Sequence, residues 1–187
     1  DPDTSAQFYA TYTDSKPTDN SVIVVCGDRS KVIDYNKIYE SSFDYSTYSN
    51  TTTGYDGEGQ LTSAISYVTS EDQPEVYVIT GHGETDLGST FTDALEKKNL
   101  NVETVNLLQK DSISADAVAG VIINGPTSDF STDDVQKVKD YLAAGGKVII
   151  TTSYAGENLT NFNSLLAEYD VQAESGVVVE GSSKNYT

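Results

Sequence analysis

Several residue types are scarce in this chain of 187 residues, and each shortage excludes a class of chemistry. A single cysteine, Cys26, permits no intramolecular disulfide, and the chain lacks the Cys-x-x-Cys pair of thioredoxin-type redox exchange. One cysteine and one histidine, His82, are too few ligands for a zinc site. Because Cys26 ends the apolar run 22–26, we expect its thiol to be buried like a small hydrophobic side chain.

Basic residues are also scarce, since 11 Lys and Arg stand against 29 Asp and Glu, a formal net charge of −18. A polyanion repels nucleic acid phosphates and anionic headgroups, so neither is an expected partner. A run of 18 apolar residues and a signal peptide are both absent, so we expect no membrane insertion by this segment. The chain has no methionine, and we expect a piece of a longer protein. An acidic surface rich in Tyr, Thr and Ser is typical of an exported bacterial domain.

The run 76–80 is the centre of the predicted fold. Its β-favouring residues continue without alternation, which indicates a strand buried on both faces, and it ends at the loop 81–84. Further strands are predicted over 102–108, 119–124, 147–151 and within 171–179. Helices are predicted over 89–98, from a capping box at Ser131 to Gly145, and over 159–169. This alternation predicts an α/β fold with a doubly wound, mainly parallel sheet of roughly five strands, with helices on both faces.

The first part of the chain predicts smaller elements. These are a short helix over 5–12, a β-hairpin with strands 21–26 and 31–34, and a helix over 61–68 with apolar residues at helical spacing. The polar, tyrosine-rich stretch 35–55 between the hairpin and that helix predicts a long irregular connection.

Five stretches together carry a resemblance: DGEGQLTSAI (56–65), TGHGE (80–84), NGP (124–126), LAAGGK (142–147) and GVVVEG (176–181). They resemble the extracytoplasmic region of the gliding-motility-type ABC transporter accessory proteins. The resemblance implies a membrane-anchored protein whose partners are the permease and ATPase subunits. It also implies a partial thioredoxin-like segment, 1–70, and an α/β domain, 71–187, similar to class I glutamine amidotransferases and flavodoxin-like folds.

Loops after the carboxyl ends of the strands line the ligand crevice of a doubly wound sheet. They carry the candidate ligand-binding residues His82, Glu84, Asn124, Thr127, Ser153, Tyr154 and Glu157. His82 can act as a base, a metal ligand or a hydrogen-bond donor. Alternatively, its glycine neighbours permit a sharp turn and His82 only holds neighbouring loops together. The ligand would be a small molecule, a saccharide or a partner protein.

Catalysis finds little support in these motifs. The strand-to-helix turn 151–155 has no cysteine, and a glycine is missing before Ser153, so an amidotransferase nucleophile elbow is absent. We therefore expect a non-enzymatic binding domain without catalytic residues, metal or cofactor. Two alternatives remain open. One is a cell-surface hydrolase acting on a saccharide or peptide through Ser153 or a His82–Glu84 pair, and the other is a purely structural scaffold for transporter assembly.

Two further clusters favour structural roles. Asp129, Asp133 and Asp134 match no calcium loop, and we interpret them as solvated acids at a helix start. The glycines of 54–59 lack the lysine of a phosphate-binding loop, and helix initiation accounts for them better.

Overall fold

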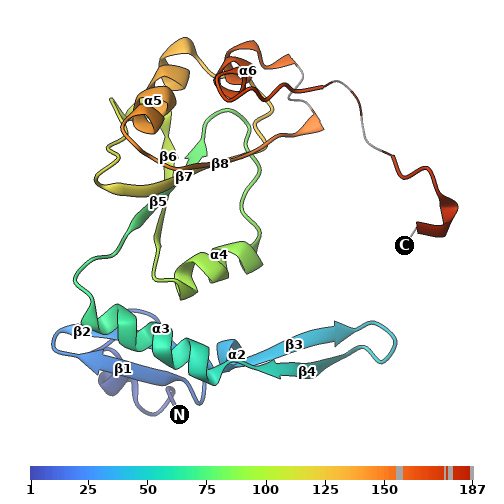
Figure 1. Ribbon diagram of the computed structural model, residues 1–187. Coiled ribbons are helices and arrows are strands. Elements are labelled where there is room, and N and C mark those ends of the chain that lie inside the picture. Colours follow the sequence, from blue (N-terminus) through green and yellow to red (C-terminus); the bar gives the residue numbers. More distant parts are fainter. Residues whose placement is uncertain (155–157, 175, 177–178, 186–187) are drawn as a thin grey trace. The chain divides into compact units, whose positions relative to one another are not determined.

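Two compact units make up the chain in the computed structural model, which describes residues 1–154, 158–174, 176 and 179–185 (Figure 1). The first unit holds Asp1–Gln73 together with Ala94–Leu100, and the second holds Pro74–Asp93 together with Asn101–Thr187. Helix α4 (Ser89–Lys97) thus begins in the second unit and ends in the first. The two units are defined by contacts within the chain and not by likeness to a known fold. The thioredoxin-like segment and the amidotransferase-like domain therefore stay predictions.

A β-hairpin opens the first unit, as the sequence predicts. Strands β1 (Val22–Cys26) and β2 (Arg29–Ile33) pair antiparallel through a turn that begins at Gly27, whose φ of 58° suits glycine. Cys26 is exposed, so the prediction of a buried thiol is wrong. A strand of a two-stranded hairpin is not enclosed on both faces, and the last two residues of β1 are both exposed.

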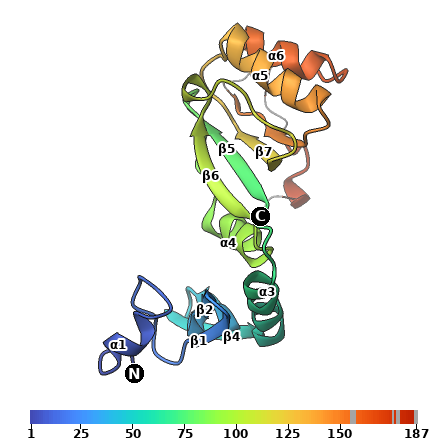
Figure 2. The ribbon, with the colours of Figure 1, turned by 90° about the vertical axis from the view of Figure 1, so that its left-hand side faces the viewer.

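Helix α3 (Gly57–Thr69) packs on this hairpin and confirms the helix predicted there (Figure 2). Its buried side chains are Ala64 and Val68, and on the strands Ile33 is buried. The predicted N-terminal helix is shorter than expected, since α1 spans only Ala6–Tyr9.

Residues 35–55 form regular structure, and the predicted irregular connection is wrong. A short helix, α2 (Tyr35–Ile38), leads into a second antiparallel hairpin of β3 (Tyr39–Asp44) and β4 (Ser49–Tyr55). Tyrosine and threonine favour strands. The usual sequence signal is missing because both faces of the hairpin are exposed, so no apolar residue alternates with a polar one.

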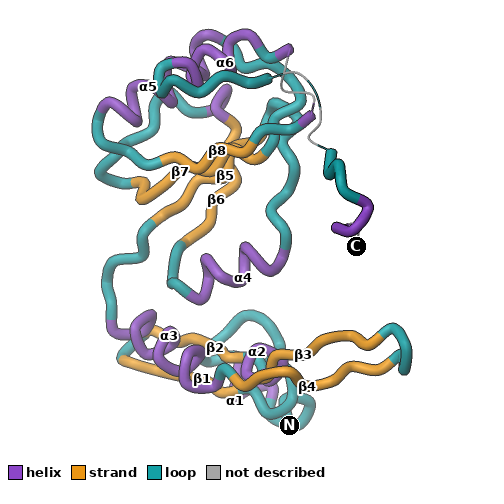
Figure 3. The backbone as a smooth tube through the Cα atoms, turned by 45° about the vertical axis from the view of Figure 1, so that its right-hand side comes forward, coloured by secondary structure: helices purple, strands orange, loops and turns teal. Residues whose placement is uncertain are grey.

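The second unit contains a four-stranded parallel sheet. It consists of β5 (Glu75–Thr80), β6 (Asn101–Asn106), β7 (Val118–Asn124) and β8 (Val148–Thr151) in the order β6-β5-β7-β8 (Figure 3). The next strand in the chain, β6, pairs on one side of β5, and the one after it, β7, pairs on the other side. A doubly wound flavodoxin-like sheet begins with the same strand order. The prediction of an α/β fold with 76–80 as its central strand is confirmed.

The fifth strand predicted within 171–179 is not observed in the described part of that segment. The described residues of this segment, 171–174, 176 and 179, belong to no strand. Residues 175, 177 and 178 lie outside the described residues.

The main core lies between one face of the sheet and the helices α5 (Thr132–Ala143) and α6 (Thr160–Ala167). Alternation along β5 turns Tyr77 and Ile79 toward this core and turns Val76 and Val78 to the other face. Side chains on both faces of β5 are buried. This explains the uninterrupted run in the sequence.

Tyr141 fixes the end of α5 to the sheet. Its buried hydroxyl donates to the Val118 carbonyl at 3.1 Å and accepts from the Lys147 N–H at 3.2 Å. Gly146 lies against its ring, and a Cβ on Gly146 would stand only 2.4 Å from ring atoms. Next to the helix end predicted at Gly145, Gly146 therefore leaves room for a large aromatic ring.

Candidate functional site

Three loops meet at the carboxyl edge of the parallel sheet. The His82 carbonyl after β5 accepts from the N–H groups of Thr127 and Ser128, which follow β7, at 3.0 and 2.8 Å. The Gly125 N–H donates to the Thr151 carbonyl at the end of β8 at 3.1 Å. β5 and β7 flank the point where the strand order reverses, and ligands bind at such points in open α/β sheets.

Gly83 makes the first of these contacts sterically possible. Its φ is 72°, and a Cβ there would lie 2.1 Å from the Thr127 hydroxyl oxygen. The same hydroxyl donates to the Gly83 carbonyl at 3.0 Å. The glycine after His82 therefore serves the close approach of two loops.

His82 is buried between two carboxylates. Its Nδ1 lies 3.1 Å from Glu84 Oε1, and its Nε2 lies 3.3 Å from Asp134 Oδ2. Its backbone N–H donates to Glu84 Oε2 at 2.7 Å. The imidazole stacks on Phe130 with ring centroids 3.8 Å apart and an interplanar angle of 12°.

Asp134 belongs to this cluster and is fully buried, so the prediction of a solvated helix-start acid is wrong for it. The predicted capping box at Ser131 brings it there. The Ser131 hydroxyl accepts from the Asp134 N–H at 3.1 Å and lies 2.7 Å from Asp134 Oδ2, to which it donates. Lys137, one turn later, places its Nζ 3.4 Å from Asp134 Oδ1 and 3.0 Å from the Leu107 carbonyl.

These contacts shift the pKa values of all three central groups. Burial by itself lowers the pKa of His82, but the hydrogen bonds and charges of Glu84 and Asp134 outweigh it and raise the pKa above its ordinary value. Burial by itself raises the pKa values of the two carboxyls, but their hydrogen bonds outweigh it and lower both. All three shifts favour an imidazolium flanked by two carboxylates.

The arrangement does not resemble a nucleophilic triad. In such a triad the histidine stands between the nucleophile and the acid. Here the carboxylate of Asp134 stands between the Ser131 hydroxyl and the imidazole. Ser153, the nucleophile of the hydrolase alternative, donates instead to the Pro126 carbonyl at 3.0 Å.

Other predicted ligand-binding residues connect the loops to one another. Asn124 Nδ2 donates to the Thr85 carbonyl and its Oδ1 accepts from the Thr151 hydroxyl, both at 2.7 Å. Tyr154 is exposed, and Glu157 lies outside the described residues.

Two residues of the His82 cluster, Phe130 and Lys137, were not among those predicted from the sequence. Phe130 and Asp134 are four residues apart, a spacing that would have placed the ring and the carboxylate near the same helix start. Nothing in that spacing indicated a contact with His82.

Metal binding finds no support in the described part of the chain, where no group of three His, Cys, Asp or Glu residues could hold an ion. Asp129 instead caps α6 by accepting from the N–H groups of Asn161 and Phe162. Asp133 is exposed and pairs with Lys137 at 2.7 Å.

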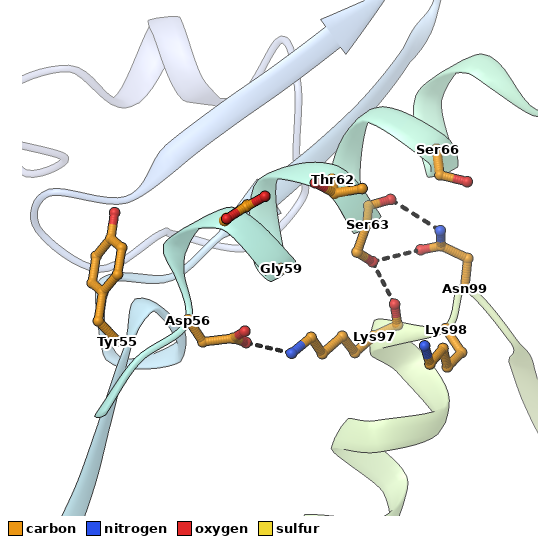
Figure 4. A pocket seen from close by; sticks show the side chains of 10 residues that line it. Tyr55, Asp56, Gly59, Thr62, Ser63, Ser66, Lys97, Lys98 and Asn99 are labelled. Atoms are coloured by element: carbon orange, nitrogen blue, oxygen red, sulfur yellow. Dashed lines mark hydrogen bonds and ion pairs between the residues drawn. The ribbon is translucent and has the colours of Figure 1, made fainter. Parts of the chain in front are cut away.

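A separate cavity of about 630 Å³ lies in the first unit between α3 and residues 97–99 (Figure 4). Lys97 Nζ contacts Asp56 Oδ2 at 2.5 Å. Ser63 donates to the Lys97 carbonyl at 2.6 Å, and Asn99 donates to the Ser63 carbonyl at 2.9 Å. The inner polar groups thus pair with one another, and only exposed side chains such as Glu58 and Lys98 are left for a ligand.

Among the described residues, no helix combines the length and apolar character needed to cross a membrane.

Comparison with known proteins shows similarity to a family, to relatives in mouse and human, and to a solved structure. The sequence profile of a family described as an ABC-type uncharacterized transport system matches residues 73–186. The protein named intraflagellar transport protein 52 homolog is 32% identical over 82 residues in Mus musculus and 33% identical over 82 residues in Homo sapiens. Each match covers 41% of this chain, which spans only 19% of the relative's length. A solved structure, the mmIFT52 N-terminal domain, shows a TM-score of 0.48 and 23% identity over 59% of this chain and 55% of that one.

Proposed function

The chain belongs to the family described as an ABC-type uncharacterized transport system, and we propose that it is the non-enzymatic, extracytoplasmic part of a membrane-anchored accessory protein of the gliding-motility type. In this proposal the loops after β5, β7 and β8 form a face that docks on the permease of the permease–ATPase complex. The observation that carries the proposal is the enclosed state of His82, whose two ring nitrogens both bond carboxylates.

A general base needs a nitrogen free to accept a proton from a nucleophile or water. His82 has neither nitrogen free, and its raised pKa favours the protonated form. This favours a structural role for the imidazole over the hydrolase alternative.

The loops themselves favour a protein partner over a small molecule such as a saccharide. Asn124, Thr127 and Ser153 use their side chains to bond neighbouring loops. A pocket for a small polar ligand usually offers unpaired donors and acceptors, whereas loops joined in this way present a fixed surface. The mouse and human relatives are named for intraflagellar transport, a name that states no catalytic activity.

The test measures binding of the full-length protein to the purified permease–ATPase complex in neutral-lipid nanodiscs. Tyr154 is 76% exposed on the proposed face, and Tyr169, 58% exposed after α6, serves as the matched control. We expect Tyr154→Ala to weaken binding about tenfold and Tyr169→Ala to leave it unchanged. Binding that neither substitution alters would remove the loops from the proposal. Binding that leaves the transport activity of the complex unchanged would favour the scaffold alternative.

A second arm addresses catalysis. Wild type, His82→Ala and Ser153→Ala are assayed with a panel of esterase, peptidase and glycosidase substrates. We expect no turnover in any of them. Wild-type turnover that both substitutions abolish would replace this proposal with the hydrolase.

A further inference from the structure

The hairpin of β3 and β4 forms a two-stranded sheet of its own in the first unit. In the described chain, neither strand pairs with a third strand. All of its strand residues except Asp44 and Gly54 are exposed. An isolated two-stranded hairpin is at best marginally stable in water, so local contacts and not a core must keep this one ordered.

Six exposed aromatic rings lie along the hairpin and the helix α2 that precedes it. We call them the aromatic face: Tyr35, Tyr39, Phe43, Tyr45, Tyr48 and Tyr55. Tyr39 and Tyr55 lie opposite each other across the strands with ring centroids 5.4 Å apart, and Phe43 contacts Tyr45 and Tyr48 edge-on at 5.0 and 6.3 Å. The rings form two contacting groups, one of Tyr35, Tyr39 and Tyr55 and one of Phe43, Tyr45 and Tyr48. Singly exposed apolar residues are ordinary, whereas two such groups on one hairpin mark an interaction surface.

The tip of the hairpin holds its rings in a fixed arrangement. Asp44 accepts from the Ser46 N–H at 2.8 Å, from the Ser46 hydroxyl at 2.6 Å and from the Thr47 hydroxyl at 2.9 Å. Tyr48 has a φ of 51°, a conformation that glycine and asparagine adopt more readily than tyrosine. Tyr45 and Tyr48 are 79% and 81% exposed. The turn thus orders two rings before any partner binds, which reduces the entropic cost of binding.

Composition and charge indicate the kind of partner. From Tyr39 to Tyr55 there is no lysine or arginine, and the charged residues are Glu40 and Asp44. Tyrosine with serine, threonine and asparagine is typical of protein-binding loops, and interface cores are poor in lysine and rich in tyrosine. Ring faces and carboxylates attract guanidinium and ammonium groups. A second copy of this chain, with a net charge of −18, would instead be repelled.

We propose that the aromatic face docks a protein whose surface carries arginine or lysine side chains around an apolar pocket, with Tyr45 and Tyr48 as the anchors. This goes beyond the proposed function, because it concerns a different surface and does not require the partner to be a transport subunit.

Photo-crosslinking of the full-length protein in its own cells tests the proposal. Benzoyl-phenylalanine replaces Tyr45 in one protein and Tyr169, exposed in the second unit, in the control. We expect a discrete protein adduct from position 45 only, with the contact mapped by mass spectrometry to a segment rich in arginine or lysine. Adding Tyr48→Asn should reduce the adduct about tenfold. Because asparagine accepts the left-handed backbone, circular dichroism and melting temperature should stay unchanged.

The outcomes separate this proposal from the proposed function. An adduct with a transport subunit supports both, and an adduct with another basic protein supports the aromatic face alone. For the purified pair, Tyr45→Ser with Tyr48→Asn should weaken binding about a hundredfold, and added salt should weaken wild-type binding. No adduct beyond the control, or an adduct with a second copy, a lipid or a saccharide, would overturn the proposal.

Discussion

Replacing Asp134 with asparagine tests whether the buried charges around His82 stabilise the second unit. The carboxylate accepts from Ser131 at 2.7 Å, from His82 at 3.3 Å and from Lys137 at 3.4 Å. Asparagine removes the charge and offers these donors only one acceptor oxygen. Removing one partner of a buried pair costs about 3–5 kcal/mol. Lys137 keeps its bonds to Asp133 and the Leu107 carbonyl, so we expect the lower end, about 3 kcal/mol.

Asp133→Asn is the matched control, because it removes the same charge one residue earlier. The side chain of Asp133 is 77% exposed and that of Asp134 only 1% exposed. An exposed ion pair contributes about 0–1 kcal/mol. The control variant should therefore unfold within about 1 kcal/mol of wild type.

The pH dependence of stability follows from the directions of the shifts. The folded pKa of His82 is raised, so its contribution is complete below the ordinary value of 6.5 and is lost as the pH rises through the raised pKa. The folded pKa values of Glu84 and Asp134 are lowered from 4.5 and 3.8, so their contributions are complete above those values and are lost on acidification. Stability from this cluster should peak between these limits and fall toward alkaline pH, and Asp134→Asn should reduce that fall.

Urea unfolding followed by far-UV circular dichroism across this pH range measures the stability of each variant. His82 is the only histidine in the sequence, so its imidazole NMR signals titrate without overlap. A His82 pKa at or below its ordinary value would refute the claim that the two carboxylates stabilise the charged imidazole. So would equal losses of stability in the two asparagine variants.

Two further substitutions test the elements that position the site. Ser131→Ala removes the cap of α5 and a partner of Asp134, and should cost about 1–2 kcal/mol in thermal unfolding. The exposed Ser128→Ala is its control, and equal melting temperatures would contradict the assigned cap. Gly146→Ala would place a Cβ 2.4 Å from the Tyr141 ring and should cost about 1–3 kcal/mol in urea unfolding. Gly120→Ala, whose Cβ would meet its nearest atom at 3.8 Å, should cost clearly less, and the same loss in both would show that the ring moves aside.

The parallel sheet could be predicted because its central strand, β5, is buried on both faces. Burial requires apolar side chains at every position of 76–79, and a short run of this kind between turn residues is typical of an enclosed strand. The capping box at Ser131 was equally readable, since it depends on local spacing. These signals lie within a few residues of one another.

The hairpin of β3 and β4 and the surroundings of His82 left no such local signal. The exposed hairpin shows no alternation that reports burial. Asp134 reaches His82 across 52 positions of sequence, and its spacing with Ser131 predicts only a cap. Exposed strands and long-range polar contacts depend on tertiary structure that periodicity does not record.

The first unit cannot be completed until residue 100 has left the ribosome. Its last segment, Ala94–Leu100, supplies the Lys97 carbonyl to which Ser63 donates at 2.6 Å and the ammonium group that pairs with Asp56 at 2.5 Å. Domains generally fold as units during synthesis, the N-terminal one first. Here β5 emerges before the first unit is closed, and its edges stay unpaired until β6 and β7 follow. Synthesis thus interleaves the folding of the two units, and a nascent chain that stops before residue 94 lacks the closing segment of the first.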